Sequence, residues 1–147
     1  MAKDGASITI DSSEFIRRMD LADARVRMGS WDAMNENRLD LENEAKNLCP
    51  VSPNGGTLLR SGNSNQPTWK GNELSASVGF NTEYAALVHE TVAPAIATPQ
   101  KRPGPTTQNK PATRFGEAGG KYLERPLLGK ARDYTAHIAK TVKKRLR

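Results

Sequence analysis

Cysteine is almost absent from this sequence, and long apolar runs are absent altogether. Cys49 is the single cysteine, which excludes an intrachain disulfide and a zinc site built mainly from thiolates. No apolar run approaches the roughly 18 residues that a membrane-spanning helix needs. The opening stretch MAKDGASITID also lacks the apolar centre of a secretory signal. We therefore expect no membrane partner and a protein that stays in the cytoplasm where it is made.

Apolar and aromatic residues are scarce as well. Hydrophobic residues make up 36% of the 147 residues, aromatic residues make up 5%, and the mean hydropathy is -0.67. A chain of this length is most simply a single domain, 1–147, but this composition gives it a thin core. We expect partner subunits to bury the apolar surface that the chain leaves open.

Positive charge is concentrated in the last third of the chain. Residues 1–50 carry 7 Lys+Arg against 10 Asp+Glu, whereas residues 101–147 carry 13 against 3. A basic end of this kind indicates an acidic partner, either nucleic acid or the acidic face of another protein. A solvated basic helix and tail is the simpler alternative, and it stays open.

The N-terminal residues predict a short strand followed by a helix. SITI at 7–10 alternates in the manner of a strand. Asp11 and Glu14 have the spacing of a capping box, so the helix should begin near Ser12. It should end before Pro50, because the residue that precedes a proline avoids helical geometry.

This helix is too long for a compact domain. Residues 12–48 would form a rod of about 55 Å, whereas a domain of this size is only about 40 Å across. The helix should therefore either bend, with Gly29-Ser30 as the expected position, or protrude and pack on a neighbour. Its predicted seam of apolar and small residues consists of Phe15, Met19, Ala22, Val26, Ser30, Ala33, Met34, Leu41, Ala45 and Leu48.

Residues 50–90 predict a small antiparallel sheet. PVSPNGGTLLRSG combines a glycine turn with a short amphipathic piece. PTWK at 67–70, the turn GN and ELSASVGF at 73–80 form a hairpin, in which alternating apolar residues indicate one wet face. EYAALVHE at 83–90 is predicted to be a third antiparallel strand, either alone or after one helical turn.

The periodicity disappears from Thr91 to Lys121, where five of the nine prolines occur. A structureless segment of about 30 residues is unusual in a compact domain, so we interpret 91–121 as an extended arm used in assembly. Pro126 then opens a last helix whose other side is rich in lysine and arginine. Its predicted apolar seam consists of Leu123, Leu127, Ala131, Tyr134, Ile138, Val142 and Leu146.

The pattern as a whole predicts an α+β fold. A long N-terminal helix and a C-terminal helix should pack on a small antiparallel sheet, with a long proline-rich loop between the sheet and the last helix. The order of elements contains no internal repeat.

Catalytic and metal-binding motifs are incomplete. His89-Glu90 begins like the HExxH helix of zinc proteases, but Ala93 stands where the second histidine is needed. We therefore place the pair at the edge of a strand, with a packing or interface role. Cys49 follows the negative end of a helix dipole, which raises the pKa of a thiol where a nucleophile needs it lowered. We expect no enzyme activity, no metal and no cofactor.

Two further groups of residues have a simple structural interpretation. Trp69 beside Lys70 could stack on a single strand of nucleic acid, but one aromatic residue is too few to favour this. We interpret Trp69 as an anchor in the core or at an interface. Asp40 and Glu44 lie on a helix surface with many charges, and we interpret them as solvated.

The order of the pieces resembles a known family. A long helix ending in AKNLCPV, a glycine turn into TLLRS, a hairpin ending in ASVGF, YAALVHE, a variable loop and KYLERPL occur in that order. This order is similar to that of the small tail-completion and head-to-tail joining proteins of long-tailed bacteriophages, often labelled minor tail component or minor capsid protein. The similarity runs from about Leu39 to Leu128. VSPNGGTLLRS is longer than the family's usual turn, and 91–121 replaces its usual short loop.

The resemblance implies a non-enzymatic structural subunit of the virion, made in the host cytoplasm, that forms a homo-oligomeric ring at the neck or tail end. The ring would be six-fold or twelve-fold, would contact connector or stopper proteins and the tail tube, and would have genomic DNA crossing its lumen. Independently of the resemblance, the thin core, the overlong helix and the arm favour a multimer. The alternative is a small cytoplasmic nucleic-acid-binding protein that uses residues 101–147.

The candidate site residues form two groups. The residues expected at a subunit or partner interface are Trp69, His89, Glu90, Pro94, Pro99, Lys101, Arg102, Pro103, Pro105 and Arg114. The residues expected to contact nucleic acid or an acidic partner are Lys140, Lys143, Lys144, Arg145 and Arg147.

Overall fold

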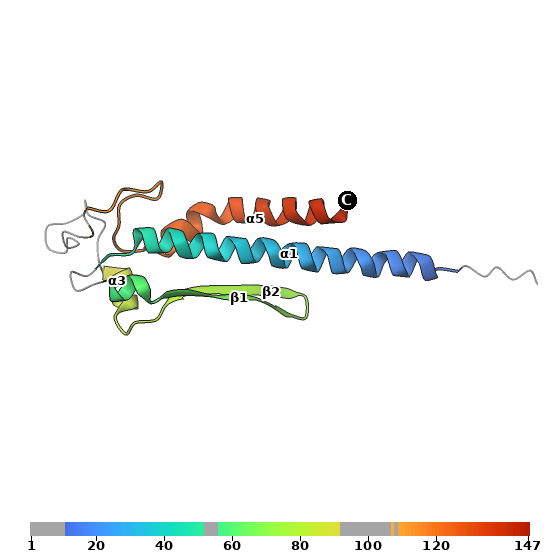
Figure 1. The fold of residues 1–147 in the computed structure, drawn as a ribbon, viewed down its shortest axis with the longest axis horizontal. Coiled ribbons are helices and arrows are strands. Elements are labelled where there is room, and N and C mark those ends of the chain that lie inside the picture. The colour runs from blue at the N-terminus through green and yellow to red at the C-terminus, as the bar shows by residue number, and fades with distance from the viewer. Residues whose placement is uncertain (1–10, 52–55, 92–106, 108) are drawn as a thin grey trace, which may run out of the picture.

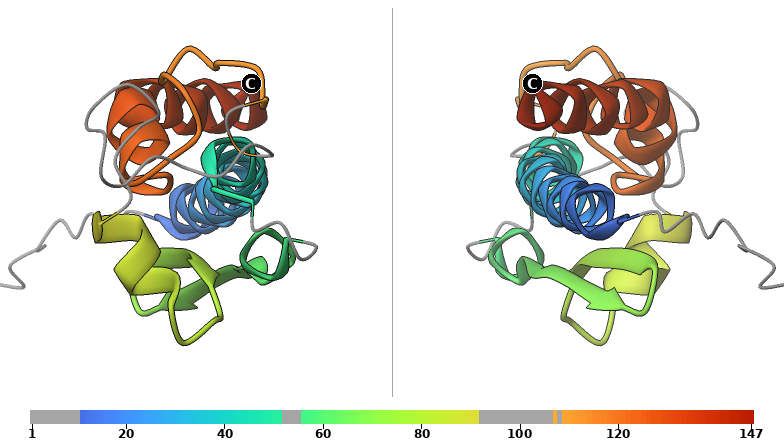
Figure 2. Two further views of the ribbon diagram at one scale, coloured as in Figure 1. Left: turned by 90° about the vertical axis from the view of Figure 1, so that its left-hand side faces the viewer. Right: turned by 90° about the vertical axis from the view of Figure 1, so that its right-hand side faces the viewer.

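The protein has an α+β fold built on one long central helix. The computed structural model describes residues 11–51, 56–91, 107 and 109–147. The elements in chain order are α1 (Ser13–Leu48), α2 (Thr57–Arg60), β1 (Gly62–Lys70), β2 (Glu73–Phe80), α3 (Ala85–Thr91) and α5 (Glu124–Leu146). Helix α1 is the middle layer, with α5 antiparallel to it on one side and the β1-β2 hairpin on the other (Figures 1 and 2). The strand expected at 7–10 lies outside the described residues.

Helix α1 begins and ends where the sequence predicts, but the capping box does not form. Asp11 Oδ1 accepts a hydrogen bond from the backbone N of Ser13 at 3.0 Å. Glu14 does not turn back towards the N-terminus, because its carboxylate forms ion pairs with Arg17 and Arg18. At the other end, the last turn closes at Leu48, and the backbone becomes extended at the next residue.

Helix α1 protrudes instead of bending. Its 36 residues form one unbroken helix of about 54 Å, which extends past the ends of both α5 and the hairpin (Figure 1). Of the two outcomes that the sequence left open, the structure shows the protruding helix and no bend at Gly29-Ser30, where Gly29 serves as a packing position. A Cβ atom on Gly29 would lie 3.1 Å from Val142 Cα, so the missing side chain lets α5 approach closely.

The predicted hairpin is confirmed, and it lies against α1. Strands β1 and β2 pair in antiparallel fashion, and Gly71 in the turn has a φ of 59°, which favours glycine. In β2, half-buried residues alternate with exposed ones, as expected for a sheet with one wet face. Trp31 Nε1 donates to Pro67 O at 2.8 Å, and Arg27 Nη1 donates to Gly71 O at 3.2 Å. These two side chains fasten the far end of the hairpin to α1.

The third strand expected at 83–90 is wrong, because Ala85–Thr91 is helix α3. The described strands therefore make a sheet of two. The burial pattern explains the helix: Ala85 is buried, Val88 packs against the core and His89 is half-buried, which is helical spacing. Alanine and leucine favour a helix, and a helix buries only one side of this segment against the core.

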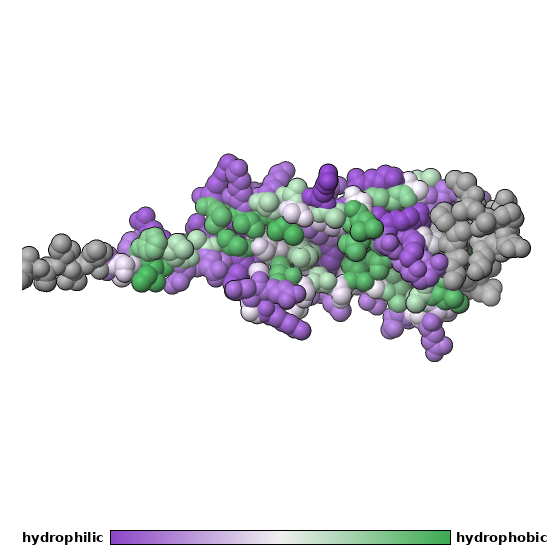
Figure 3. All heavy atoms as spheres, turned by 180° about the vertical axis from the view of Figure 1, so that it is seen from behind, coloured by the Kyte–Doolittle hydropathy of each residue, from purple (hydrophilic) through white to green (hydrophobic). Residues whose placement is uncertain are grey.

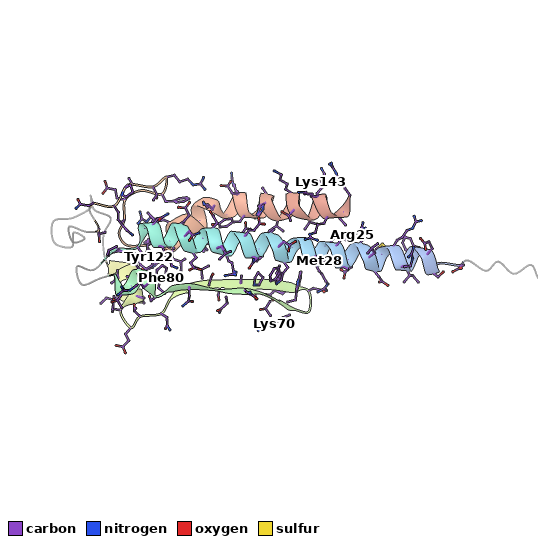
Figure 4. The ribbon with its side chains drawn as sticks, viewed as in Figure 1. Arg25, Met28, Lys70, Phe80, Tyr122 and Lys143 are labelled. Carbon is purple, nitrogen blue, oxygen red and sulfur yellow. The ribbon has the colours of Figure 1, made fainter. Side chains whose placement is uncertain are left out.

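The core is small and lies at one end of the molecule. It consists of Leu48, Cys49, Leu58, Ala85 and Tyr122, with Phe80 packed against it. The rings of Phe80 and Tyr122 meet edge to face with centroids 4.8 Å apart, and both lie at the C-terminal end of α1 (Figure 4). The thin core expected from composition is thus concentrated where α2, α3 and the start of α5 meet α1.

None of the helices in the described ranges combines the length and the apolar character that crossing a membrane requires.

Candidate assembly interface

His89 and Glu90 lie at the end of α3, where they join this helix to the start of α5. His89 Nδ1 is 2.9 Å from Glu90 Oε1, and the His89 ring meets the Tyr122 ring edge to face at 5.0 Å. The backbone N of Lys121 donates to His89 O at 2.7 Å. Hydrogen bonds from Lys121 and His89 lower the pKa of Glu90. The pair therefore holds in place the point from which the chain departs after Thr91, although the element is a helix and not the strand edge that we expected.

One group of three in the described parts of the chain could bring ligand atoms together around a metal ion. The ligand atoms of His89, Glu90 and Glu124 lie within 4.8 Å of one another. Lys121 Nζ already lies 2.5 Å from Glu90 Oε2 and 3.0 Å from Glu124 Oε2. One ammonium group thus pairs with both carboxylates, and a metal ion would have to displace it.

The far end of the arm is attached to the C-terminal end of α1. Thr107 is buried; its Oγ1 accepts a hydrogen bond from Val51 N at 2.8 Å and donates one to Val51 O. Lys110 Nζ donates to the carbonyls of Lys46, Asn47 and Cys49 at 2.8, 3.2 and 2.8 Å. These are carbonyls that the end of a helix leaves without intrahelical partners. Both ends of segment 92–106 are therefore fixed at the same end of the molecule.

Most of the expected arm residues lie outside the described residues, namely Pro94, Pro99, Lys101, Arg102, Pro103 and Pro105. Arg114 is described, and it contacts its own chain. Its Nη2 donates to Asp133 Oδ2 at 3.2 Å, and its guanidinium lies 4.7 Å from the centroid of the Phe115 ring. Its side chain remains 55% exposed, so it is also open to a neighbour.

Trp69 lies near the tip of the hairpin and is half-buried. The guanidinium of Arg27 covers one face of its ring, 4.8 Å from the centroid. Trp69 therefore anchors the hairpin to α1 within the chain, and its place at a subunit or partner interface stays a prediction. It is far from α3, which lies at the opposite end of the hairpin (Figure 1).

Helix α5 packs against an acidic surface of α1 in the same chain. Lys130 Nζ, only 11% exposed, lies 2.6 Å from Asp40 Oδ2 and 2.8 Å from Glu44 Oε1. Tyr134 donates to Asp40 at 2.8 Å, and His137 Nε2 is 3.1 Å from Glu36 Oε2. Asp40 and Glu44 are thus paired, and their interpretation as solvated residues is wrong. The sequence signal that we missed is an acidic residue at every fourth position of α1: Asp32, Glu36, Asp40 and Glu44.

The basic tail divides into one paired residue and four exposed ones. Arg145 forms an ion pair with Asp32 of α1, so it is engaged within the chain. Among the described residues, no partner is recorded for the exposed Lys140, Lys143, Lys144 and Arg147. Figure 4 shows Lys143 on the outer side of α5, near the end of this helix, with Arg25 on the neighbouring part of α1. This end of the molecule therefore presents unpaired positive charge.

Cys49 is unsuited to act as a nucleophile. It is fully buried, and burial raises the pKa of its thiol to about 12. The largest cause of this raised pKa is burial, whereas the sequence led us to expect the helix dipole as the cause.

An apolar groove opens between α1, α5 and β2. It has a volume of about 390 Å³, and its apolar lining includes Met34, Leu41, Val78, Leu123, Leu127 and Ile138. Leu127, which we expected in a buried seam, is 44% exposed there. The predicted seam of α5 is wrong at this point, because Lys130, which lies outside that seam, is the residue buried against α1, where it pairs with Asp40 and Glu44. Figure 3 shows apolar atoms in groups along the middle of one face, between polar borders, and again on the protruding end of α1.

The protruding part of α1 carries a second open apolar surface, the uncovered seam, which we define as Phe15, Met19, Ala22 and Val26. Phe15 is 66% exposed and Met19 is 56% exposed, whereas Ala22 and Val26 are half-buried. The steps of four, three and four residues continue through Gly29 to Ala33, which are buried against the rest of the fold. The same helix face is thus covered in its second half and open in its first half.

A scan against protein-family models, a search of curated proteins and a search of solved structures each found no match to this chain.

Proposed function

We propose that this chain is a structural subunit of the virion of a long-tailed bacteriophage, and that it forms a ring at the neck or tail end that completes the tail and joins it to the head. The subunit acts through contacts and carries out no reaction. Copies of the chain contact one another around the ring, and the ring contacts the connector proteins on one side and the tail tube on the other.

The observation that carries the proposal is the uncovered seam on α1. A protein that acts as a single copy gains nothing from leaving Phe15 and Met19 exposed on a helix that extends beyond the rest of its fold. A subunit of an assembly gains contact area in this way. The order of elements supports the same proposal, because it is the order in which the sequence resembles the tail-completion and head-to-tail joining proteins.

Two other surfaces fit this role. The attachments at His89, Thr107 and Lys110 hold both ends of segment 92–106 at one end of the molecule, where an arm would be presented to a neighbouring subunit. The unpaired Lys140, Lys143, Lys144 and Arg147 would face the acidic surface of a neighbour or the phosphates of DNA in the lumen.

The test combines mass measurement with particle analysis. The purified chain should form a closed oligomer with a single mass by native mass spectrometry, and antibody labelling should place it at the neck or tail end of phage particles. Absence of the chain from purified particles, together with a monomer at high concentration, would show that the proposal is wrong.

A second function is favoured by the exposed basic residues alone. As a nucleic-acid-binding protein, the chain would use Lys140, Lys143, Lys144 and Arg147 to neutralise phosphates. Its affinity would then fall steeply with salt, because binding releases counterions. Tight, salt-sensitive DNA binding by the monomer, lost when these four residues are replaced by glutamine, would favour this alternative over the ring.

A further inference from the structure

The two open apolar surfaces lie too far apart to meet within one chain. Met19 of the uncovered seam and Asn37, which lines the groove, are 18 residues apart on the same unbroken helix. At 1.5 Å per residue they are separated by about 27 Å along a rigid axis. The seam of one chain therefore cannot enter the groove of that same chain.

The elements that cover the second half of α1 are too short to cover its first half. Helix α5 ends at Leu146, four residues after Val142, which lies beside Gly29 of α1. The hairpin turn contacts α1 at Arg27 and goes no further. Residues of α1 before Val26 therefore extend beyond both neighbours (Figure 1).

Segment 92–106 is also too short to reach the uncovered seam. It leaves at Thr91 and returns at Thr107, both near the C-terminal end of α1. A chain of this length that goes out and back spans at most about 28 Å. Val26 lies about 33 Å from Leu48 along the helix axis, and Phe15 lies about 50 Å from it. The arm of the same chain therefore cannot cover the seam.

The seam and the groove are complementary in form. Phe15, Met19, Ala22 and Val26 have the spacing with which an amphipathic helix enters an apolar groove, at i, i+4, i+7 and i+11. The groove is bounded by two helices and a strand, and its volume of about 390 Å³ accepts large side chains. Helix α1 already packs its own continuation of this seam in the same surroundings.

We infer that the uncovered seam of one copy binds in the apolar groove of the next copy, head to tail. The contact joins two different surfaces, so it is heterologous, and it closes a ring if the rotation between neighbours permits. Its place in a virion rests on the proposed function, but the contact itself can be tested on the purified protein.

The first experiment places one charge on each surface. Phe15→Asp and Leu127→Asp change exposed residues, so both variants should keep the far-ultraviolet circular dichroism spectrum and melting behaviour of the monomeric fold. Each should weaken self-association by about 30-fold or more, as expected for an anchor at the centre of an interface. Matched controls are Leu21→Asp, another exposed residue of α1 but off the seam, and Ala136→Asp on the exposed side of α5. Both controls should assemble like the wild type in sedimentation velocity.

The second experiment mixes the two impaired variants. Phe15→Asp retains an intact groove and Leu127→Asp retains an intact seam, so the mixture should form a heterodimer and nothing larger. If the seam of one copy paired with the seam of another, mixing the two variants would not restore binding. Leu127→Asp alone would then still assemble. If residues 1–10 or segment 92–106 filled the groove instead, Phe15→Asp would assemble normally, and either result would overturn the inference.

The failure of this inference differs from the failure of the proposed function. Phage particles that contain the Phe15→Asp chain in normal amount and are fully infectious would reject the contact and leave the virion function intact. A chain that assembles through this contact but is absent from particles would reject the virion function and leave the contact intact. A wild-type chain that stays monomeric at about 100 μM, well above the usual Kd of a specific interface, would reject the contact.

Discussion

At the scale of single residues, Lys110 connects two parts of the chain that are far apart in sequence. Its ammonium binds three carbonyls at the end of α1, where the helix dipole concentrates negative charge. Burial lowers the pKa of Lys110 from its ordinary value. The residue both completes the helix end and holds the segment that follows the arm.

Replacing Lys110 with methionine should destabilise the fold. The substitution keeps most of the apolar stem but removes the donor from three helix-end carbonyls, two of them in part-buried hydrogen bonds, which costs about 1–3 kcal/mol. Urea denaturation of Lys110→Met should show this loss in the free energy of unfolding. Lys143→Met, at an exposed site, should change it by less than about 0.5 kcal/mol. Equal effects of the two substitutions would mean that Lys110 does not cap α1.

The Asp40–Lys130 pair should make stability depend on pH at both extremes. Burial alone would raise the pKa of Asp40, but hydrogen bonds from Lys130 and Tyr134 outweigh it and lower that pKa. Burial likewise opposes the charge of Lys130, and its two carboxylate partners raise its pKa. The contribution of Asp40 is therefore present above about pH 4 and lost as pH falls through its folded pKa. That of Lys130 is present below about pH 10 and lost as pH rises through its folded pKa.

Thermal melting of Asp40→Asn across pH 3–7 tests the acid side of this window. The variant should melt at a lower temperature than the wild type at pH 7, and the difference should shrink towards pH 3. Asp20→Asn is the matched control, because Asp20 has no recorded partner among the described residues. Its difference from the wild type should stay near zero throughout, and a constant difference for Asp40→Asn would contradict the assigned ion pair.

Single residues of the candidate site could be predicted only in part. Exposure of Lys140, Lys143, Lys144 and Arg147 followed from their position on a helix opposite its apolar residues. The pairing of Arg145 with Asp32 could not be predicted, because it joins positions 113 apart in the chain. The same holds for Lys110, since nothing in its local sequence shows which helix end it will meet.

At the scale of elements, the long periodic helices were predictable and the short helix was not. Helix α1 has 36 residues, so apolar residues at helical spacing recur many times along it, and Pro50 marks its end. Helix α3 has only seven residues, in which alternation and helical spacing select overlapping sets of residues. What decides its structure is the core, because only Ala85 and its helical neighbours need to be buried.

Gly29 sets how closely α1 and α5 approach, and Gly29→Leu should separate them. A Cβ at this position would lie 3.1 Å from Val142 Cα, which is backbone and cannot give way without moving α5. We expect a loss of about 1–3 kcal/mol from overpacking, larger than the gain in helix propensity. Ala24→Leu, at an exposed position of the same helix, is the control and should be neutral in chemical denaturation. A neutral Gly29→Leu would show that the helices are not in close contact there.

At the scale of the whole molecule, the arm should matter for assembly and not for folding. Thr107 and Lys110 carry attachments of the fold, so a test has to leave them in place. Replacing residues 95–105 by glycine and serine of equal length removes the prolines and charges without shortening the chain. The melting temperature should stay the same, while assembly of purified protein or infectivity of the phage should be lost. Full infectivity of particles that contain this variant would remove the arm from the proposal.

The shape of the molecule was predictable as a choice between two outcomes. The sequence shows that α1 is longer than a domain of this size is wide, so the helix must either bend or protrude. Which of the two occurs depends on what Gly29 contacts in the fold. The groove could not be predicted, since it arises from side chains of α1, α5 and β2 that only the fold brings together. Composition did predict that apolar surface would remain open.

Because α1 is unbroken, its number of residues sets both how far its exposed apolar residues protrude and the direction in which they point. Each residue added to a helix rotates everything before it by about 100° about the axis. One alanine inserted between Ala24 and Arg25 would therefore turn Phe15 and Met19 away from their direction while leaving the folded half untouched. Seven inserted residues would return them to within about 20° and move them about 10 Å outwards. The number of residues in α1 therefore sets the direction in which Phe15 and Met19 point relative to the folded half of the molecule.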